Sequence, residues 1–142
     1  SSNQKGVLFM KEKIKSNKGF YIGDICYVLD ERVYQEIWGN VHGFTNGKFT
    51  DPQTNMSFAV ADTRYGDGEY SDNKGRLYGV DAGVIGLVPA ELIRFDYDFG
   101  GQIFDGAGEA TFEAYNGVFF ITLPSGEVVK IDTTDEDDDM FD

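Results

Sequence analysis

The stretch TFEAYNGVFFITLPSGEVVKI, residues 111–131, decides the fold of this 142-residue chain. It holds three short runs rich in apolar residues, separated by the dipeptide Asn116-Gly117 and by Pro-Ser-Gly at 124–126. Asn-Gly between such runs is the strongest short-range signal for a two-residue hairpin, because both turn positions need a positive φ. We therefore predict a three-stranded antiparallel meander.

The residues before the meander show the same pattern of short apolar runs separated by turn residues. The chain has 18 glycines, 3 prolines and 15% aromatic residues, which is typical of short strands joined by tight turns. Residues 20–29 (FYIGDICYVL) are apolar at both parities and predict a central strand covered on both faces. Residues 94–100 (RFDYDFG) alternate as a half-exposed strand does, and residues 71–75 (SDNKG) predict a hairpin tip.

One segment has the clear pattern of a helix, and residues 89–93 (PAELI) are a candidate for a single helical turn. In the helix, the apolar residues fall on one side over residues 30–38, Asp30 can cap the first turn, and Gly39 can end it. The sequence thus predicts a mainly β domain over residues 1–131, a sandwich or partly open barrel of about nine strands with this one short helix. Residues 132–142 are expected to form an acidic, flexible tail.

The charge of the chain limits its partners. The net charge is −13, and the tail alone has seven acids and no base. Such a protein is repelled by phosphate backbones, so we expect no nucleic-acid binding and favour a basic protein surface as partner. The apolar runs fall far short of the roughly 18 residues of a membrane span. The single cysteine, Cys26, excludes an internal disulfide, and we expect a cytoplasmic protein.

The segment RYGDGEY, residues 64–70, is the main candidate site. It is either a glycine-permitted corner between strands or the rim of a ligand pocket. Asp24 is its proposed companion, because a carboxylate in an apolar strand needs partners. Either Arg64 or the backbone amides of residues 66–68 could supply them. The candidate binding residues are Asp24, Arg64, Tyr65, Asp67, Glu69, Tyr70 and Asp81.

No catalytic or metal-binding signature is present, and we assign no catalytic residue, metal ligand or cofactor. Read from Asp67 as a helix-loop-helix calcium loop, the segment fails at the sixth position, Asp72, and at the twelfth, Tyr78. Cys26 and the only histidine, His42, are interpreted as structural and loop residues, respectively. A non-standard calcium site remains open as an alternative, with ligands Asp62, Asp67, Glu69 and Asp81.

The tail has features of a docking peptide. An apolar pair follows its acidic run, and a flexible acidic strip with an apolar anchor suits a basic, grooved partner. The residues concerned are Asp137, Asp138, Asp139, Met140 and Phe141.

Two stretches, YIGDICYVL (21–29) and FAVADTRYGDGEYSDNKGRLYGVDAGVIGLVPAELI (58–93), resemble a group of small bacterial and phage proteins. That group has a Gly-Asp-x-Cys-Tyr strand followed by a YGDGxY segment, and Ile25 stands here where proline is expected. The resemblance implies that Gly23, Asp24, Cys26, Tyr27 and residues 66–70 form one structural unit. It implies no activity.

Three functions follow from these observations. The first is a non-catalytic acidic binding protein of the inhibitor, immunity or phage host-modulating type, acting on a basic protein. The second is a small-molecule binder that holds a nucleotide-like ligand between rings and cations. Its rings would come from Trp38, Tyr65, Tyr70 and Tyr78, and its cations from Arg64, Lys74 and Arg76. The third is a carboxylate- or metal-dependent hydrolase.

Overall fold

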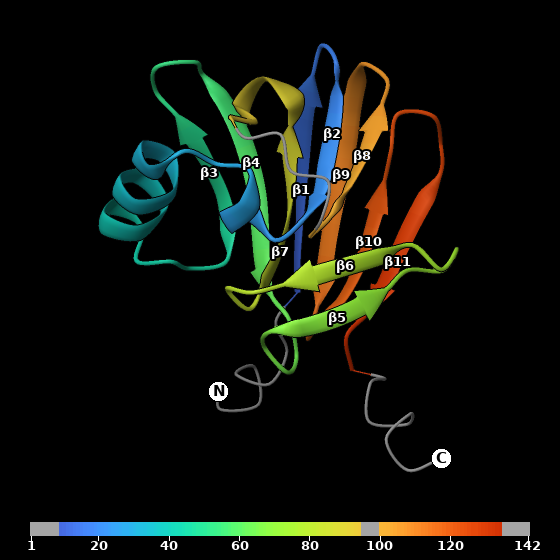
Figure 1. Ribbon diagram of the computed structural model, residues 1–142. Coiled ribbons are helices and arrows are strands. Elements are labelled where there is room, and N and C mark those ends of the chain that lie inside the picture. The colour runs from blue at the N-terminus through green and yellow to red at the C-terminus, as the bar shows by residue number, and fades with distance from the viewer. Residues whose placement is uncertain (1–8, 95–99, 135–142) are drawn as a thin grey trace.

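The computed structural model describes residues 9–94 and 100–134, and in these ranges the chain forms eleven strands and three short helices. The predicted strand of RFDYDFG lies, except for its two ends, outside the described residues. The mainly β class is confirmed, and the strands form a sandwich-like arrangement of two sheets with a separate hairpin (Figure 1).

All strands in the described ranges pair in antiparallel fashion. Sheet A has the order β1 (Phe9–Ser16), β9 (Gly108–Tyr115), β10 (Val118–Thr122) and β11 (Val128–Asp132). Sheet B has the order β3 (Gly47–Asp51), β4 (Met56–Asp62), β7 (Val84–Pro89), β2 (Gly19–Gly23) and β8 (Gln102–Asp105). The hairpin of β5 (Gly68–Ser71) and β6 (Leu77–Val80) crosses the lower end of the molecule in Figure 1.

The meander over 111–131 is confirmed as β9, β10 and β11. Asn116 and Gly117 have φ angles of 49° and 91°, as a two-residue hairpin with two positive φ angles requires. Val118 pairs with Tyr115 directly across this turn. The hairpin tip at 71–75 is likewise confirmed between β5 and β6.

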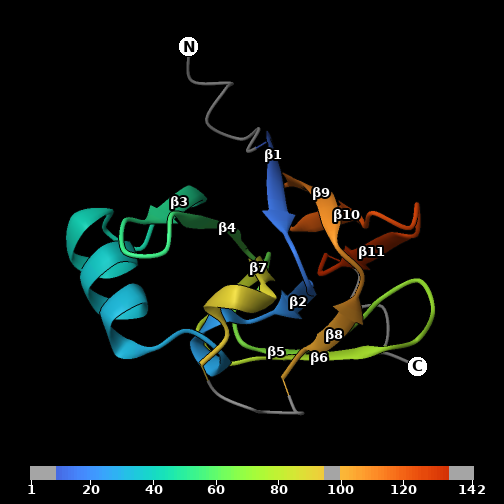
Figure 2. The same cartoon turned by 90° about the horizontal axis from the view of Figure 1, so that it is seen from above.

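The main core fills the space between the two sheets. Alternate residues of sheet A point inward, and Phe112 and Phe119 are fully buried with ring centroids 5.8 Å apart. Phe20 and Ile22 of β2 meet them from sheet B. A second cluster covers the opposite face of sheet B, so the molecule has three layers, with the longest helix beside β3 and β4 (Figure 2).

That helix, η3, extends over Arg32–Val41 and is longer than predicted. Asp30 caps it as expected, since its Oδ1 accepts a hydrogen bond from the Val33 amide at 2.9 Å. Gly39 does not end it. Its α-carbon faces the ring of Phe44, and a Cβ there would lie 2.5 Å from that ring. The glycine therefore serves close packing, and the helix ends with a wide turn in which the His42 amide donates to the Ile37 carbonyl.

The predicted strand over 20–29 is too long. β2 ends at Gly23, and residues Ile25–Tyr27 form a short 3₁₀ helix, η2. Ile25, Val28 and Leu29 are buried in the second cluster, so the second half of the apolar run forms a buried turn, whereas residues 20–23 form the predicted strand. Cys26 accordingly lies half-buried in η2 and not in the middle of a strand. The third short helix, η4 (Ala90–Leu92), follows Pro89.

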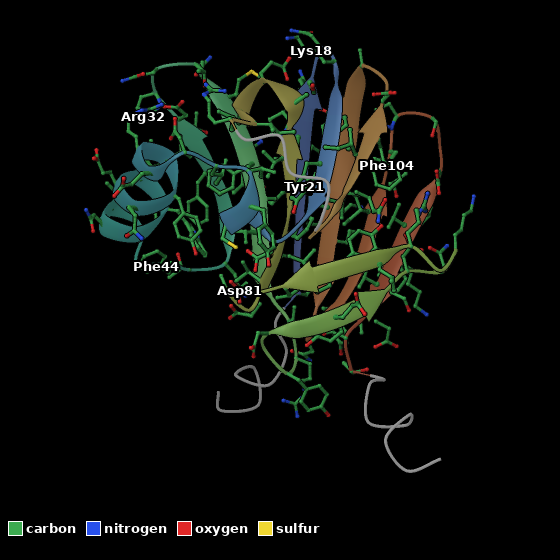
Figure 3. All side chains as sticks on the ribbon, viewed as in Figure 1. Lys18, Tyr21, Arg32, Phe44, Asp81 and Phe104 are labelled. Carbon is green, nitrogen blue, oxygen red and sulfur yellow. The ribbon has the colours of Figure 1, made fainter. Side chains whose placement is uncertain are left out.

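Helix η3 is fastened to sheet B by a bidentate ion pair. Both guanidinium NH₂ groups of Arg32 donate to the buried carboxylate of Asp51 at 2.9 Å. The hydrogen bonds from Arg32, with those from the Gln53 amide and the Thr54 hydroxyl, outweigh desolvation and lower the pKa of Asp51 to about 2. Arg32, at the start of the helix, is labelled in Figure 3.

We expect this pair to make stability sensitive to acid. A carboxyl whose pKa is lowered by folding stabilises the fold above its unfolded value near 4, and this contribution is lost as the pH falls toward 2. Arg32→Gln should therefore be less stable than the native chain at pH 7, and the difference should narrow by pH 2. Urea midpoints at three pH values measure this. A difference that is constant with pH would contradict it.

Candidate binding surface

Asp24 is a structural residue in the interior. Its side chain is buried and accepts three backbone hydrogen bonds, from Cys26 at 3.0 Å, Asp81 at 2.8 Å and Ala82 at 2.6 Å. Asp24 accepts hydrogen bonds from backbone amides, as predicted. The donors, however, lie in the turn after β6 and at Cys26, and not in residues 66–68. Asp24 thus holds the β6–β7 turn against the end of β2.

The RYGDGEY segment forms a corner that is fixed by side-chain hydrogen bonds to the Gly66 backbone. The Tyr70 hydroxyl donates to the Gly66 carbonyl at 2.9 Å, and the Thr63 hydroxyl bonds to both the amide and the carbonyl of Gly66. Gly66 has a φ of 84°, which glycine adopts without strain. The Thr63 amide donates to the Gly83 carbonyl, so the turn at 81–83 joins this corner to Asp24.

The seven predicted binding residues therefore fall into two groups. Asp24 and Tyr70 point into the protein. Asp67 and Asp81 flank the first residue pair of the β5–β6 hairpin, Gly68 and Val80, and Glu69 follows on β5. Asp81 is labelled beside this hairpin in Figure 3. The side chains that reach solvent are those of Arg64, Tyr65, Asp67, Glu69 and Asp81.

The start of the predicted tail belongs to the fold. β11 continues through Asp132, and the buried Thr133 hydroxyl accepts from the Arg64 amide at 2.9 Å and donates to the Gly117 carbonyl. The fold therefore includes residues through Thr134 and does not end at Ile131. The docking residues proposed at 137–141 lie outside the described residues. Thr134 leads into them from a point beside the Arg64 loop.

The rings proposed for a nucleotide-like ligand are mostly buried. Trp38, Tyr70 and Tyr78 lie in the interior, and Trp38 donates its indole N–H to the Thr45 carbonyl. Of the predicted set, Tyr65 is the exposed ring, with the Arg64 guanidinium 5.2 Å from its centroid. Arg76 is held by Asp72 and Glu127.

Two properties of the described part of the chain bear on catalysis and metal binding: the reactivity of the Cys26 thiol and the spacing of the acidic residues. Burial and the neighbouring Asp24 carboxylate raise the pKa of the Cys26 thiol to about 12, so it stays protonated and a weak nucleophile. Within residues 9–94 and 100–134, no three His, Cys, Asp or Glu side chains lie close enough to hold a metal ion. Asp62, Asp67, Glu69 and Asp81 therefore do not converge as a calcium site would require.

A groove that the sequence did not predict lies between the two sheets. It has a volume of about 770 Å³ and is bordered by β1, the loop before β3, the end of β4 and the Asn116-Gly117 turn. Its charged lining residues are Glu12, Asp62 and Arg64. A signal was present in the sequence: Glu12 has the same parity as Met10 and Ile14, so a carboxylate occupies a core-facing position of the strand.

Comparisons with known protein families, with curated proteins and with solved structures find no match. The resemblance of residues 21–29 and 58–93 to small bacterial and phage proteins therefore stays a prediction. No helix in the described ranges is long and apolar enough to cross a membrane.

Proposed function

We propose that the protein is a non-catalytic binding protein that attaches to a basic protein through one acidic end. This acidic end consists of the exposed residues Asp67, Glu69 and Asp81 together with the tail after Thr134. The observation that carries the proposal is the hydrogen bond from the Arg64 amide to Thr133, because it starts the tail beside the loop that bears Asp67. The acids of the loop and the tail can then act on one partner.

Three buried acids of the chain contrast with those of the acidic end. Asp24, Asp51 and Asp72 are buried and satisfied by several donors each. The acids of the acidic end have no such structural role, since Asp67, Glu69 and Asp81 form no ion pair within residues 9–94 and 100–134. Exposed charges of one sign accelerate encounter with the opposite sign and lose this effect in salt. An inhibitor, immunity or host-modulating protein would use such a surface.

A small-molecule binder is the second candidate, and the groove of about 770 Å³ is the observation that favours it. Its volume is within the range of ligand pockets. Arg64 at its border would contact an anionic group of a nucleotide-like ligand.

The first proposal is tested by capture from a bacterial lysate with three immobilised proteins. The first is the intact chain, the second is truncated after Thr134, and the third has Asp67→Asn, Glu69→Gln and Asp81→Asn. We expect basic proteins to be retained by the intact chain, to be released between about 50 and 300 mM salt, and to be lost from both variants.

A matched control for the triple substitution removes three negative charges elsewhere. Glu36→Gln, Asp105→Asn and Glu109→Gln change exposed acids on η3, β8 and β9, and this variant should retain the same proteins as the intact chain. Retention that salt and both acidic-end variants leave unchanged would refute the proposal. If the control variant lost the basic proteins to the same extent, their retention would depend on net charge alone and not on the acidic end.

A further inference from the structure

Sheet B extends one strand beyond sheet A on the side of β1, which leaves an open strand position beside β1. β1 is the last strand of sheet A and packs over β4 and β7, whereas β3 lies farther out (Figure 2). Phe49 of β3 is buried on the side of helix η3. The alternate residues Lys48 and Thr50 therefore face the open strand position, and both are exposed. The hydroxyls of Thr50 and Ser57 share a hydrogen bond of 2.7 Å there.

Two grooves follow the free edge of β1 at this position. The groove of about 770 Å³ is lined by β1 residues in the range 9–12 and by Gly47 of β3. A second groove of about 640 Å³ is lined by β1 residues in the range 13–16 and by Lys48 of β3. Together they border β1 from its first residue to its last, so an extended peptide has room along the whole strand.

The backbone of β1 has hydrogen-bonding groups that point into this space. The residues that flank the two-residue turn between β9 and β10 form a hydrogen-bonded pair, which fixes the residues of β9 that bond to β10 and those that bond to β1. By the register, the backbone N–H and C=O groups of Lys11, Lys13 and Lys15 then point away from β9. The Lys13 carbonyl accordingly accepts a hydrogen bond from Lys48 Nζ at 2.9 Å. A further strand would satisfy all of these groups.

The other edge of sheet A, on β11, is covered by the β5–β6 hairpin. Asn73 accepts from the Lys130 amide and donates to the Val128 carbonyl, both at 3.1 Å, and Asp72 pairs with Ile131. Among the described residues, the Lys48 ammonium is the one group bonded to the outward backbone groups of β1. An open strand edge is a template for pairing with another chain.

The side chains of β1 select the charge of such a chain. Its outer face has three exposed lysines, Lys11, Lys13 and Lys15. Glu113 and Glu109 lie opposite Lys11 and Lys15 on β9, so three positive charges face two negative ones, and no ion pair joins them within the described ranges. A second copy of β1 would place lysine opposite lysine, which is unfavourable. An acidic strand is favoured instead.

We propose that the open strand position binds an extended acidic segment of another protein, which adds to β1 as an antiparallel strand with its acidic side chains on the outer face. The inference goes beyond the proposed function and does not depend on it, because the surface is different and the partner has the opposite charge. Each outer acid would lie opposite a lysine of β1. On the inner side, Lys48 and Glu12 have opposite charges and Thr50 and Ser57 are polar, so small uncharged residues fit there.

The test titrates the isotope-labelled full chain with the heptapeptide Glu-Thr-Glu-Thr-Glu-Thr-Glu, blocked at both ends, and follows the backbone amides by NMR. We expect the amides of Lys11, Lys13 and Lys15 to shift, and their hydrogen exchange to slow about tenfold at saturation. The Lys130 amide, which is already bonded to Asn73, should keep its exchange rate.

Three altered peptides separate strand pairing from attraction of charge. Glutamine in place of every glutamate should weaken binding about tenfold. N-methylation of the glutamates should abolish binding, because in an antiparallel pair their amides face β1. N-methylation of the threonines, whose amides face away from β1, is the matched control and should leave binding unchanged. Equal binding of the unmodified peptide and all three altered peptides would overturn the proposal.

Variants of the chain test the same site. Lys11→Gln combined with Lys13→Gln should weaken binding about fivefold. Lys74→Gln combined with Lys130→Gln removes two exposed lysines elsewhere and should leave binding unchanged. Thermal melts of both variants verify that they are folded. Equal effects of the two variants, or no protection of the β1 amides, would overturn the proposal, and the lysines would then serve only to keep the edge from self-association.

Two other occupants are distinguished by the same titration. A chain truncated after Thr134 should bind the peptide as the intact chain does. A gain in affinity of about tenfold on truncation would show that the chain's own acidic tail competes for the position, and would overturn the proposal of a separate partner. Protection of the β1 amides that rises with chain concentration in the absence of peptide would assign the position to a second copy and overturn it as well.

Discussion

Asp24→Ala is expected to lower the free energy of unfolding by about 3 kcal/mol. The carboxylate is fully buried and accepts the amides of Cys26, Asp81 and Ala82. Its removal leaves three donors without an acceptor, and one buried donor left unsatisfied already costs about 1–3 kcal/mol. For a domain of this size the melting temperature should fall by about 10 °C. Urea unfolding with the native chain alongside measures the difference.

Asp81→Ala is the control for this prediction. It keeps the backbone amide that donates to Asp24 and removes only an exposed side chain, so stability should change by less than about 0.5 kcal/mol. Asp24→Asn, which keeps one carbonyl oxygen but introduces an amide group, should fall between the two. Equal stabilities of Asp24→Ala and the native chain would show that water replaces the carboxylate and that Asp24 does not hold the β6–β7 turn.

The features that the sequence predicted well are those determined by neighbouring residues. Asn116-Gly117 specifies its hairpin because each residue needs a positive φ, whatever lies elsewhere in the chain. The cap by Asp30 is equally local, since donor and acceptor are three residues apart. The mainly β class and the meander follow from such signals.

The features that were missed depend on contacts across the chain. Glycine is typical of helix ends, and Gly39 was therefore predicted to end the helix. The ring of Phe44 packs against Gly39 instead, and the helix continues to Val41. Residues 20–29 have the hydropathy of a strand, but an apolar run does not distinguish a buried strand from a buried turn. Asp24 was expected to need amides, yet two of its donors lie 57 and 58 residues away.

The candidate site was predicted in part for the same reason. The sequence located the corner at RYGDGEY, but the inward direction of Tyr70 depends on packing against the rest of the fold. The groove is lined by residues of β1 and β4, which belong to different sheets, and no local pattern indicates that β1 lies over β4. The one local sign of the groove is that Glu12 occupies an inward-facing position of its strand.

Asp72 links the β5–β6 hairpin to sheet A, and it is the second residue at which a single change should have a large effect. Its buried carboxylate accepts from the Tyr78 hydroxyl at 2.6 Å, from Arg76 Nε at 2.7 Å and from two backbone amides. Arg76 also contacts Glu127 at 2.6 Å in the β10–β11 turn, and Asp72 pairs with Ile131 of β11. Desolvation by burial raises the pKa of the Asp72 carboxyl, but the combined effect of these hydrogen bonds is larger, so the pKa is lowered.

Asp72→Ala should therefore cost about 3 kcal/mol, because it leaves the buried Tyr78 hydroxyl and two backbone amides without an acceptor, and one such group already costs about 1–3 kcal/mol. Tyr78→Phe removes a single hydrogen bond and should cost about 1 kcal/mol. Lys74→Ala, a matched change in an exposed ion pair with Glu127, should cost less than about 1 kcal/mol. Because the cost arises where the hairpin meets β11, hydrogen exchange at Lys130 and Ile131 should accelerate more than at Phe112. A uniform increase would mean that Asp72 stabilises the whole fold without anchoring the hairpin, and unchanged stability would refute its role altogether.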